Sequence, residues 1–302
     1  MRSFFLLARN TFRECLREPV FLLLLLTALF LTGMFPGVAL FVFREQTKLV
    51  TDSAMATTLV FALLAAVLCS AHAITREIRN GTALLLLAKP VPRWSFIQAK
   101  LAGLCAALAV FVVCCTAATL VSLRVAKDQF ELDYLVFYAY YLTLGLAAMG
   151  GGIRNYFARK SFAETTILLL LLLLPLLVAL VTLRPTDEDL PRFPAAVLPA
   201  MLLVLFATWV MAGITVVLST RLDLTSNLVC TTTIFVLGLI ADYLHGRLSG
   251  QAVAAWRWGG GLLYAALPNW QFFWMADALA AQQPIPWRYI GWAALYLALY
   301  LT

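Results

Sequence analysis

Residues 165–183 read TTILLLLLLLPLLVALVTL and contain no charged side chain. A helix of about 20 apolar residues spans the hydrocarbon core of a bilayer. A charge at the bilayer centre costs about 2.5–3.5 kcal/mol on the insertion scale. The stretch also lacks the alternation of polar and apolar residues that a barrel strand needs. It therefore predicts a transmembrane α-helix.

The whole 302-residue chain shares this character. Its residues are 63% hydrophobic and 12% charged, and the mean hydropathy is +0.91. An average soluble domain has about 45–50% apolar and about 25% charged residues, so this chain has too few polar groups to cover a globular surface. The composition excludes a soluble enzyme and a disordered chain, and it predicts an all-α integral membrane protein.

Charged residues divide the chain into nine apolar runs, of which the first seven are long enough to cross a membrane. The first begins at Pro19, and the others are 53–75, 101–123, 134–153, 165–183, 193–220 and 224–241. Run 258–276 is interrupted by glycines, a proline and aromatic residues, which predict a broken helix pair that is re-entrant or interfacial at the outer surface. Run 289–302 provides only about 21 Å of helix. We expect that this last helix either ends within the membrane or, as we favour, is cut short by the end of the sequence.

These runs predict a single permease-like transmembrane domain over residues 1–302 with seven to eight transmembrane helices. Its expected parts are a surface helix at 1–18, spans one to three at 19–123 with a long loop at 76–100, spans four to seven at 134–241, an external region at 242–288 and the start of a last span at 289–302.

Residues 1–18 predict an amphipathic helix. Arg9, Arg13 and Arg17 recur at intervals of four residues, with apolar side chains such as Phe12 on the opposing face. This pattern is typical of a helix that lies on a membrane surface and contacts lipid headgroups with its basic face. The Glu18-Pro19 pair then provides a bend into the first span.

The distribution of Lys and Arg predicts the orientation. If the N-terminus is cytoplasmic, segments 1–18, 76–100, 154–164 and 221–223 hold 13 basic and five acidic residues, and the other side holds nine basic and ten acidic residues. The positive-inside rule therefore favours a multi-pass protein of the cell (inner) membrane with a cytoplasmic N-terminus. No nucleic-acid partner is expected, because the basic residues are not gathered on one exposed domain.

The connection after the second span is the most informative one. Residues 75–100 read TREIRNGTALLLLAKPVPRWSFIQAK, in which Asn80 is suited to cap a two-turn apolar helix that Lys89-Pro90 would end. A helix this short is unstable alone in water. It must therefore pack against the rest of the chain or against a partner protein.

Several residues of this connection resemble the signature of ABC-2 type transporter permeases, which are membrane subunits of ABC transporters. They are Glu77, Gly81-Thr82 with the following leucines, Lys89-Pro90-Val91, Arg93, Phe96 and Lys100. The basic first helix, the sequence Ala266-Leu267-Pro268-Asn269 and the sequence Pro284-Ile285-Pro286-Trp287 extend the resemblance.

The resemblance implies a coupling helix that docks into a separate ABC ATP-binding subunit. The residues assigned to this ATPase-coupling element are Glu77, Arg79, Gly81, Thr82, Lys89, Pro90 and Arg93. It also implies a second permease subunit, as a homodimer or heterodimer, with ATP and Mg held by the ATP-binding partner. Such permeases usually have six spans. The larger count here, with similar hairpins at 134–183 and 193–241, indicates an inserted or duplicated hairpin.

The sequence predicts no catalytic site, metal site or cofactor in this chain. It contains no phosphate-binding P-loop, no zinc-protease motif and no nucleophile elbow. His72 is compatible with a proton-linked site, although a local hydrogen bond is the simpler interpretation. Two alternative functions remain. A secondary transporter would need ionisable residues at mid-membrane, and a lipid-modifying membrane enzyme would need a polar cluster, for which Asn155, Tyr156, Arg159, Lys160 and Glu164 are the candidates.

Overall fold

The computed structural model describes residues 2–40, 46–75, 93–126, 132–184, 196–249, 261, 264, 267–280 and 283–301. Within these residues the regular structure is helical, apart from one isolated bridge between Ala126 and Leu132. The predicted all-α fold is confirmed.

The helices follow one another along the chain with short connections. They are α1 (Arg2–Arg17), α2 (Pro19–Ala39), α3 (Gln46–Ser70), η1 (Ala71–Thr75), α6 (Arg93–Val125), α7 (Tyr134–Ala158), α8 (Phe162–Leu183), α9 (Val197–Ser219), α10 (Leu224–Leu239), α11 (Ala241–Ser249), η2 (Trp270–Phe273), α13 (Ala276–Ala280) and α14 (Trp287–Leu301).

Six helices have the length and composition to cross a membrane, namely α2, α3, α6, α7, α8 and α9. They correspond to the first six predicted spans. The seventh predicted span is α10, which has only 16 residues and meets α11 at an angle of 55°. The described part of the chain therefore has six candidate spans, or seven if the bent α10–α11 pair crosses as one.

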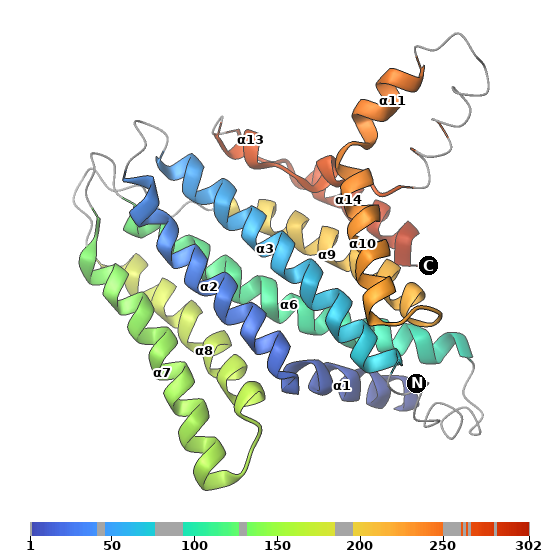
Figure 1. Cartoon of the computed structure of the whole chain (residues 1–302). Helices are drawn as coiled ribbons and strands as arrows, with labels where there is room; N and C mark the ends of the chain where they lie inside the picture. The colour runs from blue at the N-terminus through green and yellow to red at the C-terminus, as the bar shows by residue number, and fades with distance from the viewer. Residues whose placement is uncertain are drawn as a thin grey trace.

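Consecutive long helices run antiparallel, so the bundle has two ends (Figure 1). The end next to α1, called the α1 end below, also holds the turns at 159–161 and 220–223 and both helix ends that flank segment 76–92. The opposite end holds the connection between α6 and α7 and the helices α11 and α13 (Figure 1). This arrangement gathers the segments that the charge pattern predicts on one side of the membrane.

The core consists of α3, α6 and α9 with α2 packed against them. In α3, α6 and α9 the most apolar window is 67%, 67% and 72% buried, but in α7 and α8 it is only 28% buried. The α7–α8 hairpin lies at the periphery (Figure 1), where its leucines remain exposed. Gly151 of α7 allows this hairpin to close, because a Cβ at that position would collide with Thr166 of α8.

Hydrogen bonds from side chains to the backbone of another helix join the spans. Tyr140 of α7 donates to Leu29 O of α2 (2.6 Å), Ser122 of α6 donates to Thr32 O of α2 (2.8 Å), and Trp209 of α9 donates to Cys105 O of α6 (2.9 Å). Such bonds contribute about 0.6 kcal/mol each on average in membrane proteins. They fix how the helices are paired, which apolar contact alone specifies weakly.

Part of the predicted broken region 258–276 is described, and it is packed inside the protein. Trp270 and Phe273 of η2 are each 2% exposed, so they are not interfacial belt residues as the sequence suggested. Asn269 caps η2 by accepting from the Gln271 N–H (2.9 Å). Gly238 of α10 permits the close approach, because a Cβ there would collide with the Trp270 indole.

Candidate functional site

Helix α1 packs along α6 at the end of the bundle where segment 76–92 begins. Thr11, Cys15 and Leu16 are buried in this contact. Gly103 of α6 approaches the α1 backbone so closely that a Cβ would lie 2.5 Å from Ala8 O. A rigid contact between α1 and α6 follows.

The basic residues of α1 face away from this contact. Arg9, Arg13 and Arg17 are all exposed, as the spacing of four residues predicted. The prediction of an amphipathic first helix agrees with the burial along α1. The turn at Glu18, which has extended backbone angles (φ −69°, ψ 122°), directs α2 away from α1.

Ion pairs tie α1 to three other elements. Arg17 Nε lies 2.7 Å from Glu164 Oε2 of α8, and the buried Lys100 of α6 lies 3.4 Å from Glu14 Oε2. His72 Nδ1 of η1 lies 3.6 Å from Glu18 Oε1. His72 thus has a local carboxylate partner, as the simpler of the two interpretations predicts.

The chain leaves the bundle through a π-helical turn. η1 (Ala71–Thr75) continues α3, contacts α1, α9 and α10, and is followed by segment 76–92. π-helical turns are rare and occur frequently at functional sites. The chain re-enters the described structure at Arg93, the first residue of α6. The predicted coupling residues Glu77, Arg79, Gly81, Thr82, Lys89 and Pro90 lie outside the described residues.

A buried polar network lies directly beneath η1. Ser219 of α9 donates to Ser70 Oγ of α3 (3.1 Å), Asn227 Nδ2 of α10 donates to Ser219 Oγ (2.7 Å), and Thr231 donates to Asn227 Oδ1 (3.1 Å). All four side chains are at most 2% exposed. The network therefore joins three helices at the root of segment 76–92.

Sequence reasoning missed this network. Ser70, Ser219 and Asn227 are each uncharged, so each was absorbed into an apolar run. The available signal was Asn227 with Thr231 four residues later, a spacing that places both on one helix face. Their partners on α3 and α9 lie far away in sequence, and only the fold brings them together.

The chain matches the family model for ABC-2 family transporter proteins over residues 6–182. This match covers more than half of the 302 residues. The protein belongs to the ABC-2 transporter family. No curated protein and no solved structure matches the chain.

The matched range of this ABC-2 transporter protein contains α1 from its second turn to nearly the end of α8. It includes segment 76–92, both helix ends that flank it, and the peripheral α7–α8 hairpin. Membership identifies a multi-pass membrane component of a transporter, and the six membrane-capable helices agree with this assignment.

The outer end of this ABC-2 protein has its own polar contacts. Asn269 Nδ2 donates to Asp242 Oδ1 (2.9 Å) and the Asn269 N–H donates to Tyr296 Oη (3.1 Å), so Asn269 links α11, η2 and α14. His245 stacks on Tyr264 with ring centroids 4.6 Å apart. Among the described residues no group of three or more His, Cys, Asp or Glu side chains is arranged to hold a metal ion.

Proposed function

We propose that this chain is the permease subunit of an ATP-driven transporter and that it forms the substrate pathway together with a separate ATP-binding subunit. The observation that carries the proposal is the family match over 6–182, a range that includes segment 76–92. In this proposal the partner subunit holds ATP and Mg²⁺. Residues Glu77, Arg79, Gly81, Thr82, Lys89, Pro90 and Arg93 form the docking element.

The contacts at the root of segment 76–92 support a coupling role. On one side the segment is continuous with η1, which contacts α1, α9 and α10; on the other it is continuous with α6, which packs on α1, α3 and α9. A displacement of the docked segment would therefore act on the core helices rather than on the peripheral hairpin. The Ser70–Ser219–Asn227 bonds give that displacement a direct path from α3 to α9 and α10.

Helix α1 is assigned as an elbow helix that lies in the cytoplasmic leaflet of the inner membrane. Its exposed arginines Arg9, Arg13 and Arg17 would contact anionic headgroups, and its exposed Phe5 (68%) would enter the apolar layer. This places the N-terminus in the cytoplasm, on the side where the charge pattern puts segment 76–92 and the 159–161 turn.

A second permease subunit completes the proposed pathway, as the family implies. Gly145 and Gly152 of α7 are suited to close helix contact between subunits, because a Cβ added at either position meets no atom within 4 Å. In contrast, Gly151 faces α8 within the same chain. Whether the pair is a homodimer or a heterodimer decides only which chain contributes the second surface.

Two observations weigh against the alternative functions. The enzyme alternative relies on the cluster around Asn155, but Asn155 donates to the Lys160 carbonyl (2.7 Å) and Glu164 pairs with Arg17. These groups close the α7–α8 turn instead of converging on a substrate. The secondary-transporter alternative needs mid-membrane charges, whereas α2 and α9 contain none.

Retention of the ATP-binding subunit on the tagged permease tests the proposal. We expect Glu77→Lys and Gly81→Trp to leave the permease in the membrane, since no span changes, but to reduce the co-purified ATPase at least tenfold. Arg154→Gln, in an exposed position at the end of α7 on the same side, is the matched control and should retain the ATPase. Normal membrane abundance together with normal ATPase retention in both loop variants would refute the docking assignment.

A further inference from the structure

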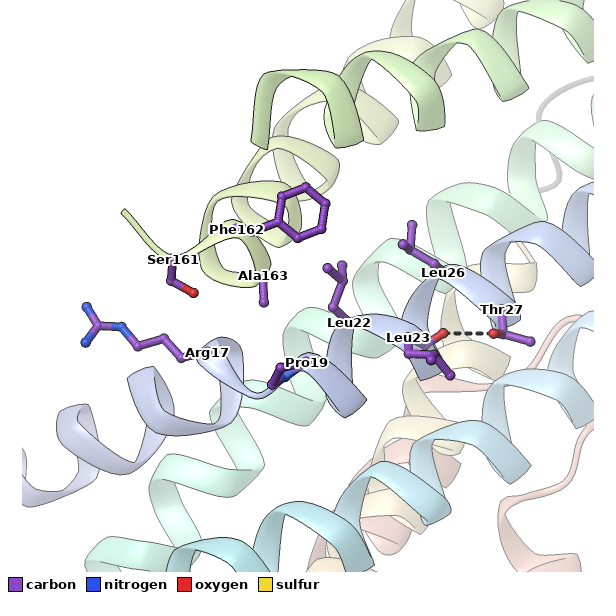
Figure 2. Close-up of a pocket in the computed structure, with 9 residues that line it drawn as sticks. All are labelled: Arg17, Pro19, Leu22, Leu23, Leu26, Thr27, Ser161, Phe162 and Ala163. Atoms are coloured by element: carbon purple, nitrogen blue, oxygen red, sulfur yellow. Dashed lines mark hydrogen bonds between the residues drawn. The ribbon is translucent and has the colours of Figure 1, made fainter. Parts of the chain in front are cut away.

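A groove of about 420 Å³ lies between the start of α2 and the first turn of α8. Figure 2 shows Leu22 and Leu26 of α2 pointing toward the same space as Phe162 of α8, with Arg17 and Ser161 at one end. The volume is within the range of about 300–1,000 Å³ that is typical of small-molecule sites. One end of the groove is thus polar and basic, and the remainder is apolar.

The polar end has unused capacity for an anion. Glu164 is the partner recorded for the Arg17 guanidinium among the described residues, and it is bonded through Nε. A guanidinium has five N–H donors, so the Nη groups remain for a second acceptor. Ser161 caps α8 by accepting the Glu164 N–H through Oγ, and its hydroxyl hydrogen can still be donated. The neighbouring Lys160 and Arg13, one helical turn before Arg17, are both exposed.

The apolar end lies deeper along α2. Leu26 is nine residues beyond Arg17, and at 1.5 Å per residue the groove extends roughly 10 Å from its basic end. Leu23 and Phe162, which border it, are 62% and 40% exposed, so the groove is open at its side. In a membrane this side faces lipid tails, while Arg17 and Lys160 lie at headgroup level.

We propose that this groove binds one anionic glycerophospholipid from the leaflet in which α1 lies. The phosphate bonds Arg17 and Ser161, and one acyl chain follows Leu23, Leu26 and Phe162. The choice of a lipid follows from the match of charge and polarity with depth: a basic mouth at the headgroup level continues into an apolar side-opening channel. A lipid seated there bridges α1, α2 and α8, and so links the elbow helix to the peripheral hairpin.

Native mass spectrometry of the full-length protein tests the proposal. The protein is delipidated in mild detergent and given an equimolar mixture of phosphatidylglycerol and phosphatidylcholine. We expect one tightly retained lipid per chain, with phosphatidylglycerol preferred about fivefold or more because basic residues near the membrane surface attract anionic headgroups. Arg17→Gln should abolish the preference, and Arg17→Lys should retain it. Leu26→Trp should reduce lipid retention by filling the groove.

Two matched variants separate this site from general lipid contact. Arg9→Gln removes an exposed arginine two turns away on the same helix, and Leu142→Trp enlarges an exposed leucine of α7. Both should retain the lipid as the wild type does. Leu26→Trp leaves the Arg17–Glu164 pair intact, so it remains informative even if Arg17→Gln is unstable. Equal retention in wild type and Leu26→Trp, or equal retention of the two phospholipids by the wild type, would overturn the proposal.

Discussion

Replacement of Asn227 by alanine should destabilise the helix bundle by about 1–3 kcal/mol. The Asn227 amide donates to two acceptors on α9, Ser219 Oγ at 2.7 Å and Thr215 O at 3.4 Å, and its carbonyl accepts from Thr231 at 3.1 Å. Two interhelical bonds at about 0.6 kcal/mol on average, and at most about 1.7 kcal/mol each, set the range. Loss of the Thr231 partner falls within helix α10 and adds to it.

The measurement is the unfolding free energy of the purified protein in lipid bicelles. A loss of 1–3 kcal/mol corresponds to a fall of about 5- to 150-fold in the ratio of folded to unfolded protein. Thr233→Ala is the matched control, since Thr233 is an exposed residue of the same helix that bonds only its own backbone at Val229 O (2.8 Å) among the described contacts. We expect less than 0.5 kcal/mol for this control, as for other surface substitutions, that is, about one third or less of the effect at Asn227.

An Asn227→Ala effect no larger than that of Thr233→Ala would contradict the reasoning. It would mean that the bonds between α9 and α10 are replaced by equally good partners when the amide is lost. A second check is Ser70→Ala, which removes the link from α3 but leaves the Asn227 bonds intact. Its cost should be smaller than that of Asn227→Ala, because one interhelical bond is lost instead of two.

Three further predictions follow from helix contacts and topology. Leucine at Gly151 should overpack the contact with α8 and lower stability by about 1–3 kcal/mol, whereas leucine at Gly145 should not, as thermal unfolding of the two variants would show. Alanine at Gly238 should displace the indole of η2 and increase its fluorescence quenching by a soluble quencher; an unchanged quenching constant would contradict the contact. Single cysteines at Gly81 and Gln251 should be labelled from opposite faces of sealed vesicles, and labelling from the same face would exclude the proposed topology.

The positions of the spans could be read from the sequence because a bilayer acts on the chain as a solvent. A run such as 165–183 is excluded from water whatever its neighbours are, and six of the seven runs assigned as complete spans coincide with membrane-capable helices. The amphipathic spacing of Arg9, Arg13 and Arg17 also predicted which face of α1 is exposed, since a single helix determines its own periodicity. The family resemblance depended on local motifs and was confirmed by the match over 6–182.

Hydropathy could not show which spans form the core. Helix α8 is the most apolar of the six candidates but its window is 28% buried, whereas that of the less apolar α9 is 72% buried. Lipid tails are as apolar as leucine, so an exposed leucine in a membrane costs little and leaves no mark in the sequence. The number of spans was overestimated for a related reason: run 224–241 is apolar throughout, yet α10 ends at Leu239 and the chain bends there.

The polar contacts inside the bundle were decided only by the tertiary structure. Ser70, Ser219 and Asn227 are unremarkable within their own segments, and they form a network because α3, α9 and α10 meet at one depth. Trp270 and Phe273 look interfacial in sequence but are buried because Gly238 lets η2 approach α10. The groove beside Arg17 likewise depends on the angle between α1 and α2 and on the position of α8. Each of these features depends on contacts between segments far apart in the chain, for which no local pattern exists.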